Sequence, residues 1–454
     1  SLTVSFIALI HAISLGWLTP IFLVLQSDDT PLPSGPLTSS ELSWLGSILC
    51  IGEMFGAVIY GYIGMYRRKL ATQLIGIPNL IFWILILVHE NIYYFYVARL
   101  LGGIAFGGLV TAIPLYISDI SMPAYRGAFG SLLPFAMTLG SLIGLTIGHY
   151  ASMSTIPYAM IPIPLIFISI MTLLPESPYI LVKRNKIDDA AQSLKFFRGP
   201  NSNIQDELEN LKKCVQNENS GKTNIKYEIK DFTNRNSLKG ILMSLFVVLA
   251  NPFCGIFIIF TYISTVFEES GSYLHANEAG FIVGAAQVLG VFISYLIIDR
   301  FGRRILLSIS TLGVSVGFTV MGIYTYLTKN FLIEIENADG TYNLLTIIPI
   351  VSLSAAVLFG YVGIVSMTFM LIPELTEPKI RGICCTVGMF ILSFAAFIAL
   401  KIFPILMESI QLYGEMWIFA GFNLISLLIV VLFMPETKGK SLFVVQSETI
   451  EVGK

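Results

Sequence analysis

Long apolar segments alternate with short polar turns along most of the chain. Twelve of them are long enough to cross a bilayer as helices, which takes about 20 apolar residues each. The strands of a membrane barrel would alternate apolar and polar residues, and these segments do not. The pattern therefore predicts an all-α membrane protein with twelve transmembrane helices. The predicted spans are 2–25, 42–65, 71–89, 93–120, 127–149, 156–174, 239–267, 278–298, 305–327, 344–373, 382–407 and 414–434.

One long hydrophilic stretch, residues 175–239, interrupts this pattern and carries 12 of the 27 Lys and Arg residues. Within it, 185–199 and 204–214 combine helical spacing with mixed charge, which indicates short amphipathic helices. Residues 217–224 are expected to form a flexible break. The predicted organisation is an N-terminal six-helix bundle (1–174), a cytoplasmic helical linker (175–238), a C-terminal six-helix bundle (239–434) and a cytoplasmic tail (435–454).

The two apolar halves repeat each other. SDISMPAYRG at 118–127 matches PELTEPKIRG at 373–382, with an acid seven residues before the Arg-Gly pair in both. Three matched pairs of residues are separated by similar offsets of 235, 255 and 260 residues: Arg68 and Arg303, Arg126 and Arg381, and Glu176 and Glu436. We infer a duplicated unit and therefore two pseudo-symmetric bundles.

Composition agrees with a membrane protein. The chain is 55% hydrophobic and only 12% charged, whereas soluble domains have about 25% charged residues. The net charge of −2 gives no reason to expect a nucleic-acid partner. The five cysteines fall in predicted spans, in the linker or at a cytoplasmic span end, so no disulfide framework is expected. We find no metal-ligand spacing, no cofactor motif and no nucleophile–base arrangement, so the chain is not expected to be an enzyme.

The sides of the membrane follow from Lys and Arg. The loops at 26–41, 268–277 and 328–343 contain Lys329 as their only base, while the linker and the turns on the other side are rich in bases. Positively charged loops remain on the cytoplasmic side. The linker and both termini are therefore predicted to be cytoplasmic.

Charged residues gather at the cytoplasmic ends of the spans. An Arg fork can bridge carboxylates from different helices, and such pairs could lock the cytoplasmic mouth in one state of a rocking protein. The alternative is that these charges only fix the topology. The candidate gating charges are Asp119, Arg126, Glu176, Asp299, Arg300, Arg303, Arg304, Glu374, Arg381 and Glu436.

Five further motifs carry a resemblance: RLLGGIAFGG (99–108), PESPYILVKR (175–184), LIIDRFGRR (296–304), ELTEPKIRG (374–382) and PETKGKSL (435–442). With them the chain resembles, over essentially its whole length, the sugar porter family of the major facilitator superfamily. It looks most like the insect facilitated trehalose and hexose transporters. The resemblance implies a central solute cavity, alternating access and a sugar as small-molecule partner. We further expect a protein of the plasma membrane that functions as a monomer.

The resemblance also implies which residues bind the solute, although several of these positions depart from the family pattern. Gln287 and Tyr262 match family positions, whereas the amides usual in helices 5 and 7 and the Pro-rich turn and Trp usual in helix 10 are replaced. An unpaired buried hydroxyl costs about 1–3 kcal/mol, so other polar groups must compensate or the solute differs. A nutrient sensor and a uniporter of a less polar solute therefore remain alternatives. The candidate solute-binding residues are Gln287, Asn251, Phe257, Tyr262, Tyr361, Phe369 and Thr138.

The sequence also bears on whether solute transport is coupled to protons. Proton-coupled relatives place an acid in helix 1 near an arginine of helix 4. Arg99 is present, but Leu18 and Thr19 occupy the helix 1 position, which favours uniport. His11 and Glu53 lie within predicted spans, where an ionisable residue is a functional candidate. A proton relay through them is one interpretation, and a protonated Glu53 hydrogen-bonded to a neighbouring helix is the other.

Overall fold

The computed structural model describes residues 2–28, 30–88, 91–121, 126–151, 153, 155–199, 204–220, 234–272, 274–330, 344–377 and 380–436. All regular secondary structure in this part of the chain is helical. The first half contains α1 (Leu2–Gln26), α2 (Ser39–Tyr66), α3 (Arg68–Leu74), α4 (Gly76–Val88), α5 (Ile92–Ile120), α6 (Arg126–Tyr150), α7 (Ile156–Met160) and α8 (Pro162–Leu173).

The linker contains three short helices, α9 (Pro178–Lys183), α10 (Ile187–Arg198) and α11 (Gln205–Ser220). The two amphipathic helices predicted there are confirmed, although α11 continues into the segment expected to be a break and ends at Ser220. The second half contains α13 (Arg235–Phe253), α14 (Ile256–Thr261), α15 (Ile263–Ser270), α16 (Ala276–Phe301), α17 (Arg303–Lys329), the 3-10 helix η2 (Leu344–Ile347), α18 (Ile348–Val362), α19 (Ile364–Leu375) and α20 (Arg381–Phe433).

Eleven helical segments of the described chain are long and apolar enough to cross a membrane. The longest contains Gln411, with φ 61° and ψ 168°, a conformation that no α-helix includes. The chain therefore turns there, and α20 supplies two spans. Counted in this way, the twelve predicted spans are confirmed.

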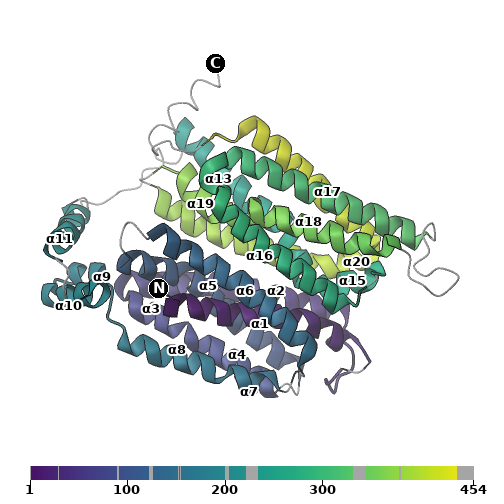
Figure 1. Ribbon diagram of the computed structural model, residues 1–454, viewed down its shortest axis with the longest axis horizontal. Coiled ribbons are helices and arrows are strands. Elements are labelled where there is room, and N and C mark those ends of the chain that lie inside the picture. The colour runs from purple at the N-terminus through teal and green to yellow at the C-terminus, as the bar shows by residue number, and fades with distance from the viewer. Residues whose placement is uncertain are drawn as a thin grey trace. The chain divides into compact units, whose positions relative to one another are not determined.

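The chain divides into two compact units. Unit 1 comprises residues 1–11, 51–137 and 153–228, and unit 2 comprises residues 12–50, 138–152 and 229–454. Unit 2 thus combines the second-half helices with segments of α1, α2 and α6 from the first half. Within unit 2, α16, α17 and α18 lie side by side (Figure 1).

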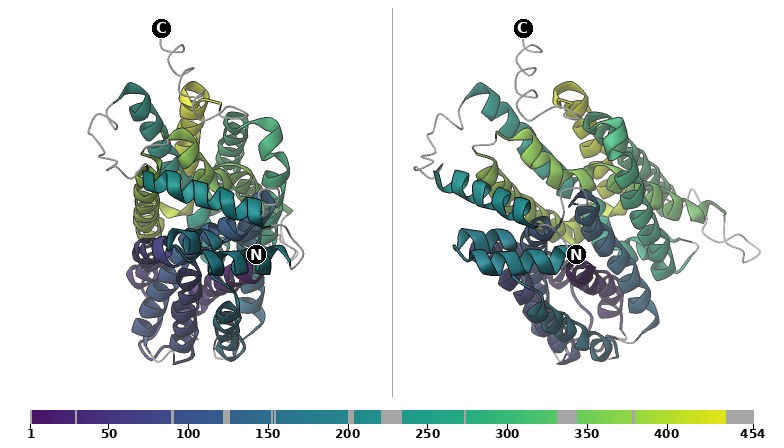
Figure 2. Two further views of the ribbon diagram at one scale, coloured as in Figure 1. Left: turned by 90° about the vertical axis from the view of Figure 1, so that its left-hand side faces the viewer. Right: turned by 60° about the vertical axis from the view of Figure 1, so that its left-hand side comes forward.

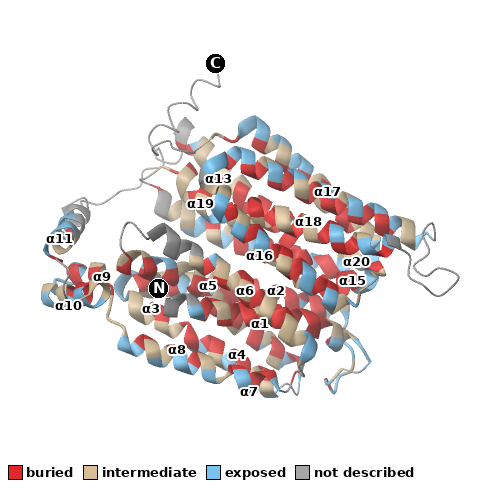
Figure 3. Cartoon of the chain, in the orientation of Figure 1, coloured by how far each residue is buried: buried red, intermediate tan, exposed pale blue. Residues whose placement is uncertain are grey.

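One face of α17 shows how these helices meet the bilayer. Its exposed residues are large and apolar and recur every three or four positions, at Ile305, Ile309, Leu312, Val316 and Val320. The opposite face is buried and includes small polar residues (Figure 3). A soluble helix would have the reverse arrangement, so this apolar stripe is the surface expected to contact lipid.

Glycines let two pairs of helices approach closely. In unit 1, a Cβ added at Gly107 of α5 would lie 2.4 Å from the Glu53 carbonyl oxygen of α2. In unit 2, a Cβ at Gly144 of α6 would lie 2.3 Å from the Ile13 carbonyl oxygen of α1. Real Cβ atoms do not fit at these distances, so backbone contact requires glycine at both positions.

The linker helices form a small core of their own at the end of the unit 1 helices where α5 ends (Figures 1 and 2). Leu181, Val182, Ala190 and Val215 are buried together. This packing explains why a short polar segment of a membrane protein folds into helices, since amphipathic helices gain most of their stability from burying one face.

Arg198 ties the linker helices to the transmembrane part of unit 1. Its guanidinium donates two parallel hydrogen bonds to the Glu207 carboxylate, of 2.9 and 2.6 Å, and a third of 2.7 Å to the Ile120 carbonyl at the end of α5. The bidentate geometry fixes the orientation of Arg198. The linker is therefore attached at the point where α5 leaves the membrane.

Candidate functional site

Two buried amide side chains lie in unit 2 among the predicted solute-binding residues. The Gln287 amide nitrogen donates to the Tyr361 hydroxyl at 2.7 Å and so joins α16 to α18. Gln287 is 4% exposed, and its carbonyl oxygen has no hydrogen-bond partner among the described residues. An amide oxygen accepts hydrogen bonds, so Gln287 offers a buried acceptor for a solute hydroxyl.

Asn251 is placed by a second pair. Its amide nitrogen donates to the Thr368 hydroxyl at 3.0 Å, and that hydroxyl donates to the Ile364 carbonyl at 2.6 Å. The pair joins α13 to α19. As with Gln287, the amide nitrogen is used within the protein.

Breaks in the helices position these side chains. Between α13 and α14 the chain turns at Gly255, which has φ +87°. A Cβ there would lie 2.7 Å from the Phe419 ring, so both the left-handed conformation and the space require glycine. Between α18 and α19 the chain turns at Gly363, and the Ser310 hydroxyl accepts from the freed Ile364 amide at 3.0 Å.

Tyr262 lies at the junction of α14 and α15, and its side chain is enclosed by aromatic rings. Its ring stacks on Phe403 with centroids 5.2 Å apart and contacts Phe22 at 5.7 Å. Its hydroxyl donates to the Leu400 carbonyl at 3.2 Å, and the residue is 1% exposed. In this structure Tyr262 packs the broken helix against α1 and α20.

The other predicted solute residues differ in exposure. Thr138 is buried, Phe257 is half-buried and Phe369 is 46% exposed. All seven lie in unit 2. Two surface cavities of this unit, of about 400 and 260 Å³, are lined by none of the seven.

The three residues considered for proton coupling all lie in unit 1. His11, Glu53 and Arg99 are 0%, 5% and 4% exposed. The His11 Nδ1 atom lies 3.2 Å from the Asn79 amide nitrogen, and its ring stacks on Phe106 with centroids 5.7 Å apart. Asn79, at 1% exposed, was missed in the sequence, because one amide in an apolar span carries no recognisable pattern.

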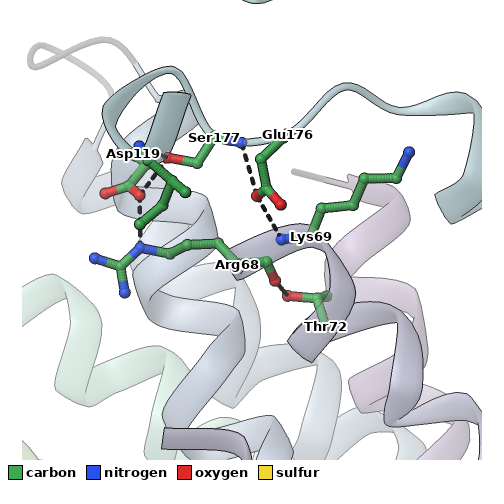
Figure 4. Close-up of polar contacts among 7 residues, drawn as sticks. Arg68, Lys69, Thr72, Asp119, Glu176 and Ser177 are labelled. Carbon is green, nitrogen blue, oxygen red and sulfur yellow. Dashed lines mark hydrogen bonds and ion pairs between the residues drawn. The ribbon is translucent and has the colours of Figure 1, made fainter. Parts of the chain in front are cut away.

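A charge network joins α3, α5 and the start of α9 in unit 1 (Figure 4). The Arg68 guanidinium contacts the Asp119 carboxylate at 2.7 Å, and the Ser177 hydroxyl donates to the same carboxylate at 2.6 Å. The Glu176 carboxylate accepts from the Lys69 backbone amide at 2.7 Å and from that of Ser177 at 3.0 Å. Glu176 thus places a negative charge at the N-terminus of α3, where backbone amides favour it.

Unit 2 contains an equivalent network. The Glu436 carboxylate accepts from the Arg303 and Arg304 backbone amides at 2.9 and 3.2 Å, at the N-terminus of α17. The Arg303 guanidinium contacts the Glu374 carboxylate at 3.5 Å. A Cβ at Gly302, which has φ +84°, would lie 2.6 Å from Glu436, so the helix start requires glycine.

The two networks match through the repeat. Arg68 corresponds to Arg303 and Glu176 to Glu436, and each network joins residues of a single unit. The candidate gating charges did not include Arg68, Lys69 or Ser177, although the repeat pairs Arg68 with Arg303.

Among the other candidate gating charges, Arg300 is exposed. The side chains of Arg126, Asp299 and Arg381 lie outside the described part of the structure.

The fold and the duplicated charge networks define a helical, multi-spanning membrane protein built from two six-helix repeats. Residues 13–448 match the family described as "Sugar (and other) transporter". The chain belongs to this family, so it is a membrane transporter and not an enzyme.

Curated relatives give a narrower comparison. The chain is 30% identical over 412 residues to the facilitated trehalose transporter Tret1 of Bombyx mori, covering 89% of this chain and 78% of that one. It is 28% identical over 447 residues to the Tret1 of Apis mellifera ligustica, covering 97% and 86%. The predicted resemblance to insect trehalose transporters is therefore confirmed.

Solved structures confirm the fold. The inward open conformation of the xylose transporter XylE from E. coli matches with a TM-score of 0.78 at 17% identity, covering 98% of each chain. The proton:xylose symporter XylE bound to 6-bromo-6-deoxy-D-glucose matches with a TM-score of 0.71 at 20% identity, again covering 98% of each. The chain therefore has the major facilitator fold of twelve helices.

Proposed function

We propose that the protein carries a sugar, trehalose or a hexose, or a related small polyol across the membrane by facilitated diffusion. The observation that carries the proposal is the pair of buried amides, Gln287 and Asn251. Each donates its nitrogen to a hydroxyl of the protein, and the Gln287 oxygen is buried without a partner among the described residues. Several hydroxyl groups on one solute suit such acceptors, because each buried polar group then has a partner. The similarity to trehalose transporters supports the same solute class.

Alternating access supplies the movement in this proposal. The two predicted six-helix bundles, residues 1–174 and 239–434, tilt against each other around the solute, as inverted or parallel repeats do in other transporters. The candidate gating charges at the cytoplasmic mouth change partners between the two states. Transport is passive, because helix 1 has Leu18 and Thr19 where proton-coupled relatives have an acid. In this proposal His11, Glu53 and Arg99 form a polar cluster that holds α1, α2 and α5 together.

The proposed setting is the plasma membrane, with the linker and both termini in the cytoplasm and a monomer as the functional form. The distribution of Lys and Arg supports this orientation. An epitope added after Lys454 would be stained only after permeabilisation of intact cells. Staining of unpermeabilised cells would overturn the orientation.

Uptake of radiolabelled trehalose and glucose in oocytes tests the function. Surface biotinylation measures how much protein reaches the plasma membrane. We expect saturable uptake of at least one sugar that exceeds the uptake of water-injected cells and is insensitive to an imposed pH gradient. Absence of uptake of both sugars by protein at the surface would contradict the proposal, and binding without uptake would favour the sensor alternative.

A further inference from the structure

One lysine in unit 2 lies in an apolar span and binds only residues of another helix. The Lys401 ammonium on α20 donates to the Ser43 hydroxyl on α2 at 2.8 Å and lies 4.0 Å from the centre of the Trp44 ring. These two are its only partners among the described residues, and neither is a carboxylate. The charge is therefore stabilised by a buried hydroxyl and by a cation–π contact.

Further contacts join the same two helix ends. The Ser39 hydroxyl at the start of α2 donates to the Glu408 carboxylate of α20. Trp44 also contacts the Phe397 ring, with centroids 6.1 Å apart. Close by, a Cβ added at Gly46 of α2 would meet the Tyr262 hydroxyl at 2.0 Å. We call the set formed by Lys401, Ser43, Trp44, Ser39 and Glu408 the clasp.

The clasp links the two repeats of the chain. α2 belongs to the first repeat and α20 to the second, and the clasp residues all lie in the part of α2 that is grouped in unit 2 and in α20. Two repeats that open and close a mouth between them must separate there in one state. Since the described partners of the Lys401 ammonium all lie on α2, that separation leaves the ammonium in an apolar span without these partners.

We propose that Lys401 is a positioning residue of the transport cycle, which holds the mouth at the N-terminal end of α2 closed and so sets the resting ratio of the two facing states. The proposal rests on the proposed alternating-access function, and in the proposed orientation this mouth is the outer one. A contact changes such a ratio only by the difference in its strength between the two states. The Lys401 contacts exist in one state only, so their full strength acts on the ratio.

The test measures the state of the mouth without any solute. Spin labels are attached to cysteines introduced at Ser34 and Ser409, which are exposed, lie in unit 2 and precede Ser39 and follow Glu408 in the sequence, respectively. The background is the full chain with its five native cysteines replaced and its membrane insertion retained. Pulsed electron paramagnetic resonance then gives the populations of short and long distances across the mouth.

Lys401→Met keeps the length and apolar stem of the side chain and removes the charge. We expect the ratio of short to long distances to fall about tenfold, which corresponds to about 1.4 kcal/mol. Lys401→Arg retains a stacked, donating cation and should keep the ratio near that of the parent. Lys329→Met removes an exposed lysine at the end of α17 and should leave the ratio unchanged.

A second variant gives an independent result if Lys401→Met is poorly folded. Trp44→Leu removes the ring partner and should lower the ratio in the same direction. Lys401→Met added to Trp44→Leu should then have a smaller effect than it has alone, because the two residues share one interaction. An unchanged ratio in both single variants would overturn the proposal. A changed ratio in a protein that takes up no sugar would contradict the proposed function and leave the clasp supported.

Discussion

The affinity for solute is expected to depend on single amide oxygens, and Gln287 offers the clearest case. Its nitrogen is bound to Tyr361 and its oxygen is buried without a partner among the described residues. Gln287→Ala should raise KM by roughly 5- to 150-fold, because a lost hydrogen bond in a buried site costs about 1–3 kcal/mol. The turnover number should change much less. Initial rates of uptake over a range of sugar concentrations measure both quantities.

Tyr361→Phe is the matched control for this change. It removes the hydroxyl that holds the Gln287 amide and leaves the amide oxygen in place, so KM should rise less than in Gln287→Ala. An unchanged KM in Gln287→Ala would show that this amide does not bind the solute.

Individual glycines decide how closely the helices pack, and Gly107 gives a sharp test. Gly107→Ala would place its Cβ 2.4 Å from the Glu53 carbonyl oxygen and 2.5 Å from the Ala57 amide nitrogen. Both are backbone atoms that cannot rotate away, so the helices must separate at a cost of about 1–3 kcal/mol. The melting temperature in detergent should fall. Gly61→Ala, where the added Cβ has no neighbour within 4 Å, should stabilise α2 slightly, and an equal loss in both variants would contradict the packing argument.

The helices themselves were largely predictable from hydropathy. Every predicted span has a helical counterpart, because long apolar runs in a bilayer must satisfy their backbone groups internally. The breaks within spans were not predicted in detail. The turn between α13 and α14 depends on the left-handed Gly255 next to Phe419, and the turn in α20 depends on Gln411. Such positions are set by tertiary contacts that a single apolar run does not encode.

The starts of α3 and α17 show what a sequence repeat predicts about structure. Acids and arginines were expected to pair in each half, and the structure pairs Arg68 with Asp119 and Arg303 with Glu374. The role of Glu176 and Glu436 as acceptors for backbone amides at helix starts was not expected. It depends on chain segments that are far apart in sequence, and residue spacing alone does not show which carboxylate meets which helix end.

The unit 1 network should influence the rate of conformational change more than solute binding. Asp119→Asn removes the charge that pairs with Arg68 and weakens the hydrogen bond from Ser177. The turnover number should fall severalfold with little change in KM, because no predicted solute-binding residue lies in unit 1. The measurement is the concentration dependence of uptake, normalised to surface protein.

Asp189→Asn is the control for this charge change. Asp189 pairs with Lys186 at 3.7 Å on the exposed linker, where both side chains are more than half exposed. Pairs of this kind contribute about 0–1 kcal/mol, so turnover should be unaffected. A turnover number in Asp119→Asn equal to that of the parent would contradict the role of the network.

For the molecule as a whole, the sequence predicted the class, the number of spans and the repeat, but not the grouping of the chain into units. Unit 2 collects the segments 12–50 and 138–152 together with the second-half helices. Hydropathy and charge have the same pattern whichever mouth of a transporter is closed, so no feature of the sequence specifies this grouping. The Lys401 contacts with α2 were missed for the same reason, since they join residues that are distant in sequence.

The central claim is that the two repeats carry a sugar across the membrane by passive alternating access, and a counterflow experiment tests this claim most directly. Proteoliposomes are loaded with unlabelled trehalose and diluted into a trace of labelled trehalose, with the same measurement repeated for glucose. A carrier that releases an unlabelled sugar outside returns with a labelled one. The label should therefore accumulate inside the proteoliposomes, transiently above its external concentration, and then decline. Correctly inserted protein that gives no transient accumulation with either sugar would contradict this account.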